Sequence, residues 1–127
     1  MSQMPSQPNT EPLPFEEIQQ TIQSIYPISA AIEYKTNGEL PDSYATFYLV
    51  SEVPEAKFSN QMHRLNCRYS VCLFERDRRK LEENSPLIRQ AMISAGYRYV
   101  STSTDISYPQ TGHFSRTLDF RKYSEVT

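Results

Sequence analysis

The sequence predicts an α+β domain in which a mainly antiparallel sheet of four to five strands carries two or three packed helices. Residues 64–74 alternate between apolar and polar side chains, which is the period of a half-buried strand. In residues 81–95, apolar side chains recur at helical spacing, so one stripe of that helix needs an apolar partner. The nearest partner is the apolar face of the preceding strand, and we expect the rest of the chain to be organised around this pair.

The size and charge of the chain limit what it can do. It has 127 residues, with 13 basic and 15 acidic side chains and a net charge of −2. That length suits one domain with one core. The charge gives no basic excess for duplex nucleic acid or an anionic membrane. Neither an apolar run of membrane-spanning length nor a signal peptide is visible, so we expect the chain to stay where it is made.

The two cysteines predict a reducing compartment. Cys67 and Cys72 lie five residues apart on one predicted strand and on opposite faces of it. At about 3.4 Å per residue they are roughly 17 Å apart. A disulfide requires Cα atoms within about 7 Å, so the two thiols are expected to stay free.

Residues 1–14 predict a flexible, proline-rich N-terminal arm, and residues 15–127 the folded domain. The arm holds four of the nine prolines and no lysine, arginine or aromatic residue, so it can bury too little to offset its ordering entropy. An alternative is that the arm becomes ordered on a neighbouring subunit. Phe15, Ile18, Ile22 and Ile25 then form a helical stripe that ends before Pro27.

Two strand candidates follow this helix. Residues 28–34 form a modest one, and residues 44–50, which are apolar or aromatic on both faces, form a clear one that suits a central position. Residues 51–61 contain Pro54 and mixed charges, and they predict a long loop in which Phe58 is exposed unless something covers it.

The second half of the chain predicts a helix and two strands. Ser85 followed by Pro86 fits an N-cap and first helical position, so residues 78–84 are expected to form a separate turn or a kinked preceding helix. Gly96 is expected to end the helix. Residues 97–103 and 113–123 predict strands, the second with Phe114, Leu118 and Phe120 on one face, and residues 105–112 predict a loop.

No pattern in the sequence predicts a catalytic, metal or cofactor site. His63 and His113 lack cysteine or histidine partners at zinc-binding spacing, and the three glycines are too dispersed for a P-loop or a dinucleotide fingerprint. A Cys72 nucleophile with His113 stays open as an alternative, although a buried strand cysteine is usually inert. A small enzyme or ligand-binding module is a second alternative, and it would need a pocket with converging polar groups.

Two other features have both a structural and a functional interpretation. The basic cluster of Arg76, Arg78, Arg79 and Lys80 is interleaved and flanked with acids, so it predicts a solvated turn with local charge pairs, or alternatively a charged rim at a partner contact. The nine tyrosines suit strands, but tyrosine is also enriched at protein interfaces.

The succession of these segments resembles the small tail terminator and tail completion proteins of long-tailed bacteriophages. The resemblance covers about residues 15–123. It is carried by Pro27 with the short strand after it, Tyr44-Ala45-Thr46-Phe47-Tyr48, the loop with Phe58-Ser59-Asn60, Tyr69-Ser70-Val71-Cys72-Leu73-Phe74 before a run of charges, Ala95-Gly96-Tyr97, and the closing strand from Arg116 to Phe120.

The resemblance implies a non-catalytic virion protein, made in the host cytoplasm, that forms a ring, commonly a hexamer. Such a ring would sit on the head-proximal end of the tail tube, stop tube growth and join tail to head. Its partners would be copies of itself, the tube protein and a head-completion or connector protein, with DNA only passing through the ring lumen and with no membrane. A head-closure or connector protein on the portal side is the alternative.

A closed ring needs two different complementary patches on each subunit. Residues 53–61 and 105–112 are expected to carry contacts, with Phe58 and Tyr108 as anchors because large exposed rings gain most from burial. The full set of candidate interface residues is Val53, Pro54, Phe58, Asn60, Arg76, Arg78, Arg79, Tyr108 and His113.

Overall fold

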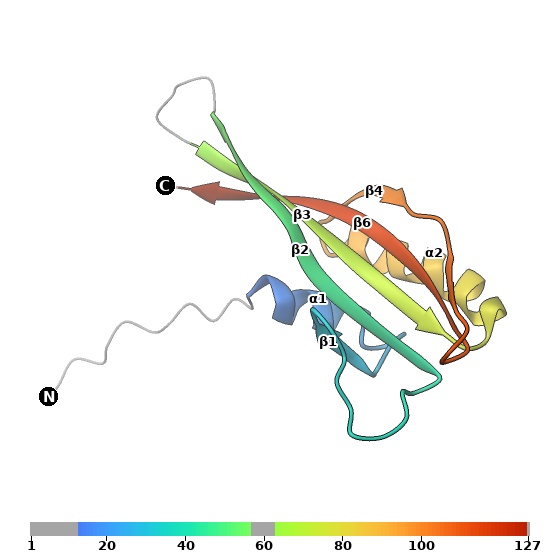
Figure 1. Ribbon diagram of the computed structural model, residues 1–127. Helices are drawn as coiled ribbons and strands as arrows, with labels where there is room; N and C mark the ends of the chain where they lie inside the picture. The colour runs from blue at the N-terminus through green and yellow to red at the C-terminus, as the bar shows by residue number, and fades with distance from the viewer. Residues whose placement is uncertain (1–12, 57–62, 127) are drawn as a thin grey trace, which may run out of the picture.

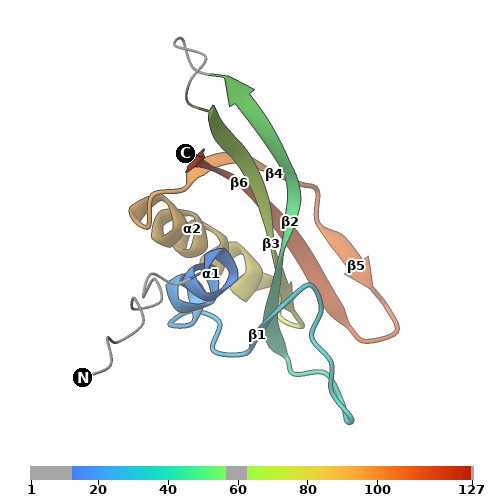
Figure 2. The ribbon, with the colours of Figure 1, turned by 90° about the vertical axis from the view of Figure 1, so that its left-hand side faces the viewer.

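The computed structural model describes residues 13–56 and 63–126, and in this part of the chain two helices lie on one face of a six-stranded sheet (Figures 1 and 2). This confirms the α+β class, with a larger sheet than the predicted four to five strands. The elements in chain order are α1 (Pro14–Ile22), β1 (Ser29–Ala31), β2 (Ser43–Ala56), β3 (His63–Glu75), α2 (Arg78–Ser94), β4 (Arg98–Thr102), β5 (Ile106–Tyr108) and β6 (His113–Val126).

The sheet is mixed, with strand order β1-β2-β3-β6-β4. The short β1 runs parallel to β2, and all the other strand pairs are antiparallel. β6 pairs with β3 along its whole length, while β4 and β5 share its other side. β5 lies inside residues 105–112, so the prediction of a continuous loop there is wrong. Because β3 and β6 pair as far as His63 and Val126, β6 continues beyond the predicted end at Tyr123.

β2 is longer than predicted, because residues 51–56 continue the strand instead of starting a loop. Val53 and Pro54 pair with Asn66 and Leu65 of β3, after a bulge that leaves Val50 as an extra residue. Pro54 is tolerated because β1 reaches only as far as Phe47, so β2 has no second strand neighbour at this position. The remainder of the predicted loop, with Phe58 and Asn60, lies outside the described residues.

The core lies between the helices and one face of β2, β3 and β6. It follows the predicted period of two along β3, where Val71 and Leu73 are fully buried. Leu118 and Phe120 of β6 are also buried and Phe114 is partly buried, which confirms their shared face. The helices contribute Ile18, Ile22, Leu81, Ile88 and Met92.

Helix α1 ends at Ile22, three residues before its predicted end. The backbone N–H groups of Ile25 and Tyr26 both donate to the carbonyl of Ile22, at 2.9 and 2.8 Å. These two hydrogen bonds close a turn at the end of the helix. The turn buries the Tyr26 ring, which is 1% exposed. Pro27 then favours an extended backbone at Tyr26. At the other end Pro14 is the first helical residue, so the helix includes the last position of the predicted arm.

Helix α2 runs from Arg78 to Ser94 as one element, so the predictions of an N-cap at Ser85 and of a separate turn over residues 78–84 are wrong. Asp77 is the N-cap, and its side chain accepts a hydrogen bond from the Arg79 N–H at 3.0 Å. Ser85 is buried inside the helix, where its hydroxyl donates to the Leu81 carbonyl at 2.8 Å. Pro86 therefore sits about two turns beyond the helix start and is accommodated within the helix.

Gly96 ends α2 as predicted. Its φ is +100°, and the N–H of Tyr97 donates to the Met92 carbonyl at 3.0 Å while the N–H of Gly96 donates to Ile93 at 3.0 Å. These two bonds form a Schellman motif, which needs the left-handed backbone that glycine adopts without a steric cost.

A paired arginine fixes the segment before β5 to β6. Arg116 donates to both carboxylate oxygens of Asp105, at 2.7 and 2.8 Å, and to the Ser85 hydroxyl at 3.3 Å. Both members of the ion pair are about four-fifths buried, with side-chain exposures of 20% and 21%. The bond from Arg116 lowers the pKa of Asp105 below the 3.8 of an unperturbed aspartate.

We expect the Asp105→Asn chain to lose about 1–3 kcal/mol of unfolding free energy at neutral pH, because a charge-assisted bidentate pair is broken. A depressed folded-state pKa stabilises the fold above pH 3.8, and this contribution is lost as the pH falls through the lower folded value. Urea denaturation at about pH 7 and about pH 3 should therefore show a smaller acid-induced loss in the variant. Asp42→Asn, whose side chain is 79% exposed, is the control. Equal losses in both variants would contradict the assignment.

Candidate functional site

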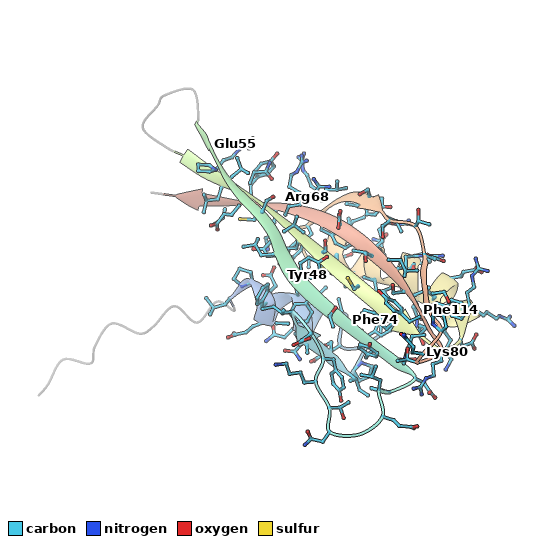
Figure 3. The ribbon with its side chains drawn as sticks, viewed as in Figure 1. Tyr48, Glu55, Arg68, Phe74, Lys80 and Phe114 are labelled. Atoms are coloured by element: carbon cyan, nitrogen blue, oxygen red, sulfur yellow. The ribbon has the colours of Figure 1, made fainter. Side chains whose placement is uncertain are left out.

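No described helix covers the sheet face opposite α1 and α2, and we call it the open face (Figure 3). Tyr48, Arg68 and Phe74 point from it. Along β2, β3 and β6 every second side chain belongs to it, including two buried polar residues, Thr46 and Ser70. Its members are mostly aromatic at one end of the face and charged at the other. This mixture suits a surface that contacts another macromolecule.

The aromatic end consists of Tyr34, Tyr44, Phe74, Tyr108 and His113. Tyr44 stacks on Phe74 with ring centroids 4.6 Å apart, and the rings of Tyr34 and His113 contact Tyr44 at 5.5 and 5.4 Å. Tyr108 from β5 lies over Phe74 at 6.0 Å. Tyr108 remains 38% exposed, so it is available for a contact, but it stands on a strand and not on a loop tip.

His113 does not fit its predicted role as an interface residue, because its side chain is buried. It is the first residue of β6 and is 1% exposed. Its Nε2 atom lies 2.7 Å from the carbonyl oxygen of Pro41, and Tyr44 covers the ring edge-on. The loop before β2 therefore buries this side chain, which ties two segments of the aromatic end together.

The basic cluster contains the local charge pairs that its structural interpretation predicts. Arg76 donates to Asp42 at 2.7 Å and to the Thr111 carbonyl at 3.0 Å, so it joins three segments beside the aromatic end. Arg79 pairs with Glu83 on the surface of α2 at 3.1 Å. Arg78 is exposed at the first position of α2.

The predicted interface residues do not form one patch. Arg76, Tyr108 and His113 gather at the aromatic end, whereas Val53 and Pro54 lie near the far end of β2. Nine residues separate Tyr44 from Val53, which is about 30 Å along a strand. Val53 is 50% exposed on the open face, beside the ion pair between Arg64 and Glu55 at 3.0 Å.

The charged end of the open face carries a row of arginines that sequence reasoning missed. Arg68, Arg121 and Arg98 stand directly opposite one another on β3, β6 and β4. Arg68 contacts Asp119 at 3.4 Å, and Arg64 and Arg98 both lie over the Tyr123 ring, at 3.8 and 6.0 Å. Like charges in register repel each other, so this arginine row favours an acidic neighbour. No local motif links positions 68, 98 and 121, and only the strand register brings them together.

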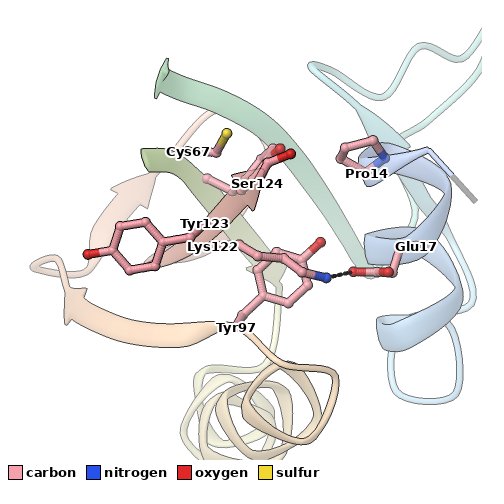
Figure 4. Close-up of a pocket in the computed structure, with 8 residues that line it drawn as sticks. Pro14, Glu17, Cys67, Tyr97, Lys122, Tyr123 and Ser124 are labelled. Carbon is pink, nitrogen blue, oxygen red and sulfur yellow. Dashed lines mark hydrogen bonds and ion pairs between the residues drawn. The ribbon is translucent and has the colours of Figure 1, made fainter. Parts of the chain in front are cut away.

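A cavity of about 210 Å³ lies between the start of α1 and the end of β6 (Figure 4). Lys122 points across it to Glu17, with Nζ and Oε1 2.6 Å apart, and its ammonium lies 4.5 Å from the centre of the Tyr97 ring. Burial alone would raise the pKa of Glu17, but the bond from Lys122 holds it below its ordinary value. The ion pair thus fastens α1 to the sheet.

The cavity lacks an activated nucleophile among the described residues that line it. Burial, reinforced by Glu52, raises the pKa of the Cys67 thiol, and burial raises that of the Tyr97 hydroxyl as well. A raised pKa disfavours the thiolate that nucleophilic chemistry needs. The other cysteine, Cys72, contacts the Thr117 hydroxyl at 3.2 Å, four residues along β6 from His113, so the two cannot form a dyad.

The cysteines are both free, as predicted. In residues 13–56 and 63–126 no group of three histidine, cysteine or acidic side chains could hold a metal ion. Neither of the described helices is long and apolar enough to cross a membrane.

Comparison with protein-family models and with curated proteins finds no match to this chain.

Proposed function

We propose that the chain is a structural protein of a long-tailed bacteriophage that forms a ring at the head-proximal end of the tail tube. The ring ends tube polymerisation and joins the tail to the head. The proposal rests on the resemblance of residues 15–123 to tail terminator and tail completion proteins, and the observed order of strands and helices is compatible with it. The uncovered sheet face supports it, because a ring subunit must present broad surfaces to several neighbours.

The long strands suit this role mechanically. β2, β3 and β6 extend past the helices as a three-stranded blade (Figure 1). A blade supported by continuous backbone hydrogen bonds can present side chains well away from the core without a loop having to become ordered. The arginine row and the aromatic end then lie on one rigid surface at a fixed spacing.

The decisive experiment locates the protein in the particle. We expect an antibody against it to label one end of purified tails, and we expect particles that lack it to contain overlong, unjoined tubes. Label on filled, tailless heads would favour the alternative, a head-closure protein on the portal side. Normal joining and infection without the polypeptide would refute both proposals.

We expect Tyr108→Ala to reduce the joining of tails to heads about tenfold or more, because a half-exposed ring is an efficient interface anchor. An in vitro joining assay with purified heads and tails measures this. Tyr108→Phe keeps the ring over Phe74 and should join normally. The same assay applies to Phe58→Ala at the second predicted anchor. Unchanged joining in both alanine variants would show that the anchors are wrong.

A further inference from the structure

The sheet has two lateral edges of opposite character. One is the part of β2 beyond Phe47, where β1 no longer pairs, and the other is β4, the last strand in the order. Because they border opposite sides of one rigid sheet, a single copy cannot bring them together. A contact between them therefore requires a second copy in a head-to-tail arrangement.

The β2 edge borders an apolar groove of about 350 Å³, which we call the edge groove. Leu13, Phe15 and Leu49 line it, and Leu13 and Leu49 are 68% and 43% exposed. Glu16 and Glu52 add two carboxylates, one from the first turn of α1 and one from β2. The groove is therefore apolar with an acidic margin.

The β4 edge carries the complementary chemistry. The Tyr99 ring packs on Phe120 at 6.0 Å and is still 37% exposed. The guanidinium of Arg89, from α2, lies 5.4 Å from the centre of the Tyr99 ring, and the exposed Arg98 is the next residue along β4. We call these three residues the basic knob: Tyr99 and Arg89 lie together on the helical side of β4, and Arg98 stands on the opposite face of the same strand.

Side chains and not added strands are expected to make the contact. The β2 edge is interrupted by the bulge at Val50 and by Pro54, which has no backbone N–H. A bulge and a proline are both typical of sheet edges that resist the addition of another strand. An aromatic ring with cations along the same sheet edge fits an apolar groove with carboxylates without using these backbone groups.

We propose that the basic knob of one copy docks into the edge groove of the next, with Arg89 and Arg98 facing Glu16 and Glu52. This inference rests on the proposed ring, for which it supplies the two different patches of a heterologous contact. The arginine row ends at Arg98, so it brings further positive charge to the same edge. Because the attraction is electrostatic, added salt should weaken the assembly.

Charge reversal tests the contact. Arg89→Glu/Arg98→Glu and Glu16→Lys/Glu52→Lys should each weaken self-association about 10- to 100-fold, because like charges then meet. An equimolar mixture of the two double variants should assemble again, since each reversed edge meets an opposite partner. The chain with all four reversals should also self-assemble. Sedimentation velocity at low salt measures the assembly state.

Lys35→Glu/Lys80→Glu is the matched control for Arg89→Glu/Arg98→Glu, because it makes the same change in net charge at exposed positions outside the edge groove and the basic knob. It should assemble as the wild type does, and unchanged thermal melting of every variant shows that the fold survives. Rings that persist in both reversal variants would refute the contact and leave the ring proposal intact. A wild-type chain that stays monomeric even with tail tubes would refute both. Assembly lost only on deletion of residues 1–12 would assign the edge groove to the arm and refute the basic knob.

Discussion

The Phe47→Ala chain is expected to lose about 3–5 kcal/mol of unfolding free energy, a large share of the stability of a domain of this size. Phe47 is 1% exposed in the first half of β2, and its ring packs edge-on against Phe15 of α1 at 5.7 Å. Truncation would remove the buried ring and leave a cavity between the sheet and α1. Urea denaturation, followed by circular dichroism, measures the change.

The next residue along the strand provides the matched control. Tyr48 points to the open face and is 37% exposed, so Tyr48→Ala is expected to cost less than about 1 kcal/mol. The two variants truncate an aromatic side chain on each face of β2, so they compare the loss of stability on the buried face with that on the open face. Equal losses in the two variants would show that the core does not lie on the helical side of β2.

Glu75→Ala is expected to cost roughly 2–4 kcal/mol, because it removes a buried carboxylate and leaves two partly buried donors without their acceptor. The carboxylate ends β3 in a site that is 1% exposed. It accepts hydrogen bonds from the Ser43 hydroxyl and from the Asn84 amide, the latter at 3.2 Å. One side chain thus connects the start of β2, the end of β3 and the middle of α2.

Two variants separate this network from a simple loss of charge. Glu75→Gln keeps an acceptor and nearly the same volume, and it should cost about half as much or less. Glu82→Ala removes an exposed glutamate from α2 and should change the stability by about 0.5 kcal/mol or less. A Glu75→Ala variant as stable as Glu82→Ala would contradict the network. The measurement is again urea denaturation, with the unfolding midpoint and slope compared across the series.

Glu75 is one of the acids that flank the basic cluster, so the prediction of a solvated turn includes it, and at Glu75 this prediction is wrong. The residue begins a run of charges, and composition alone favours exposure for such a run. Burial results because Ser43 and Asn84 arrive from segments 32 residues before it and nine residues after it. The same reason explains the error at His113, where Pro41 approaches from 72 positions away. Partners from other segments of the chain produce no pattern in the sequence next to the residue that they bury.

The candidate interface residues also divide into those that the sequence predicted and those that only the structure revealed. Tyr108 was found as an exposed aromatic residue, but Val53 and Pro54 turned out to be strand residues, and the arginine row was missed. Arg68, Arg98 and Arg121 are neighbours because β6 pairs with both β3 and β4. A shift of one residue in either pairing would put an arginine on the opposite face. The register depends on turns and bulges, and the sequence does not reveal it at these positions.

The sequence by itself determined the parts that depend on local periodicity and backbone chemistry. These are the alternation of β3, the helical stripe of α2 and its end at Gly96, because side-chain spacing and the left-handed backbone act within a few residues. Only the tertiary structure decided the parallel β1, the length of β2, the buried Glu75 and the two contrasting edges of the sheet. Each of these depends on contacts between distant segments, whose free energy is shared across the whole fold.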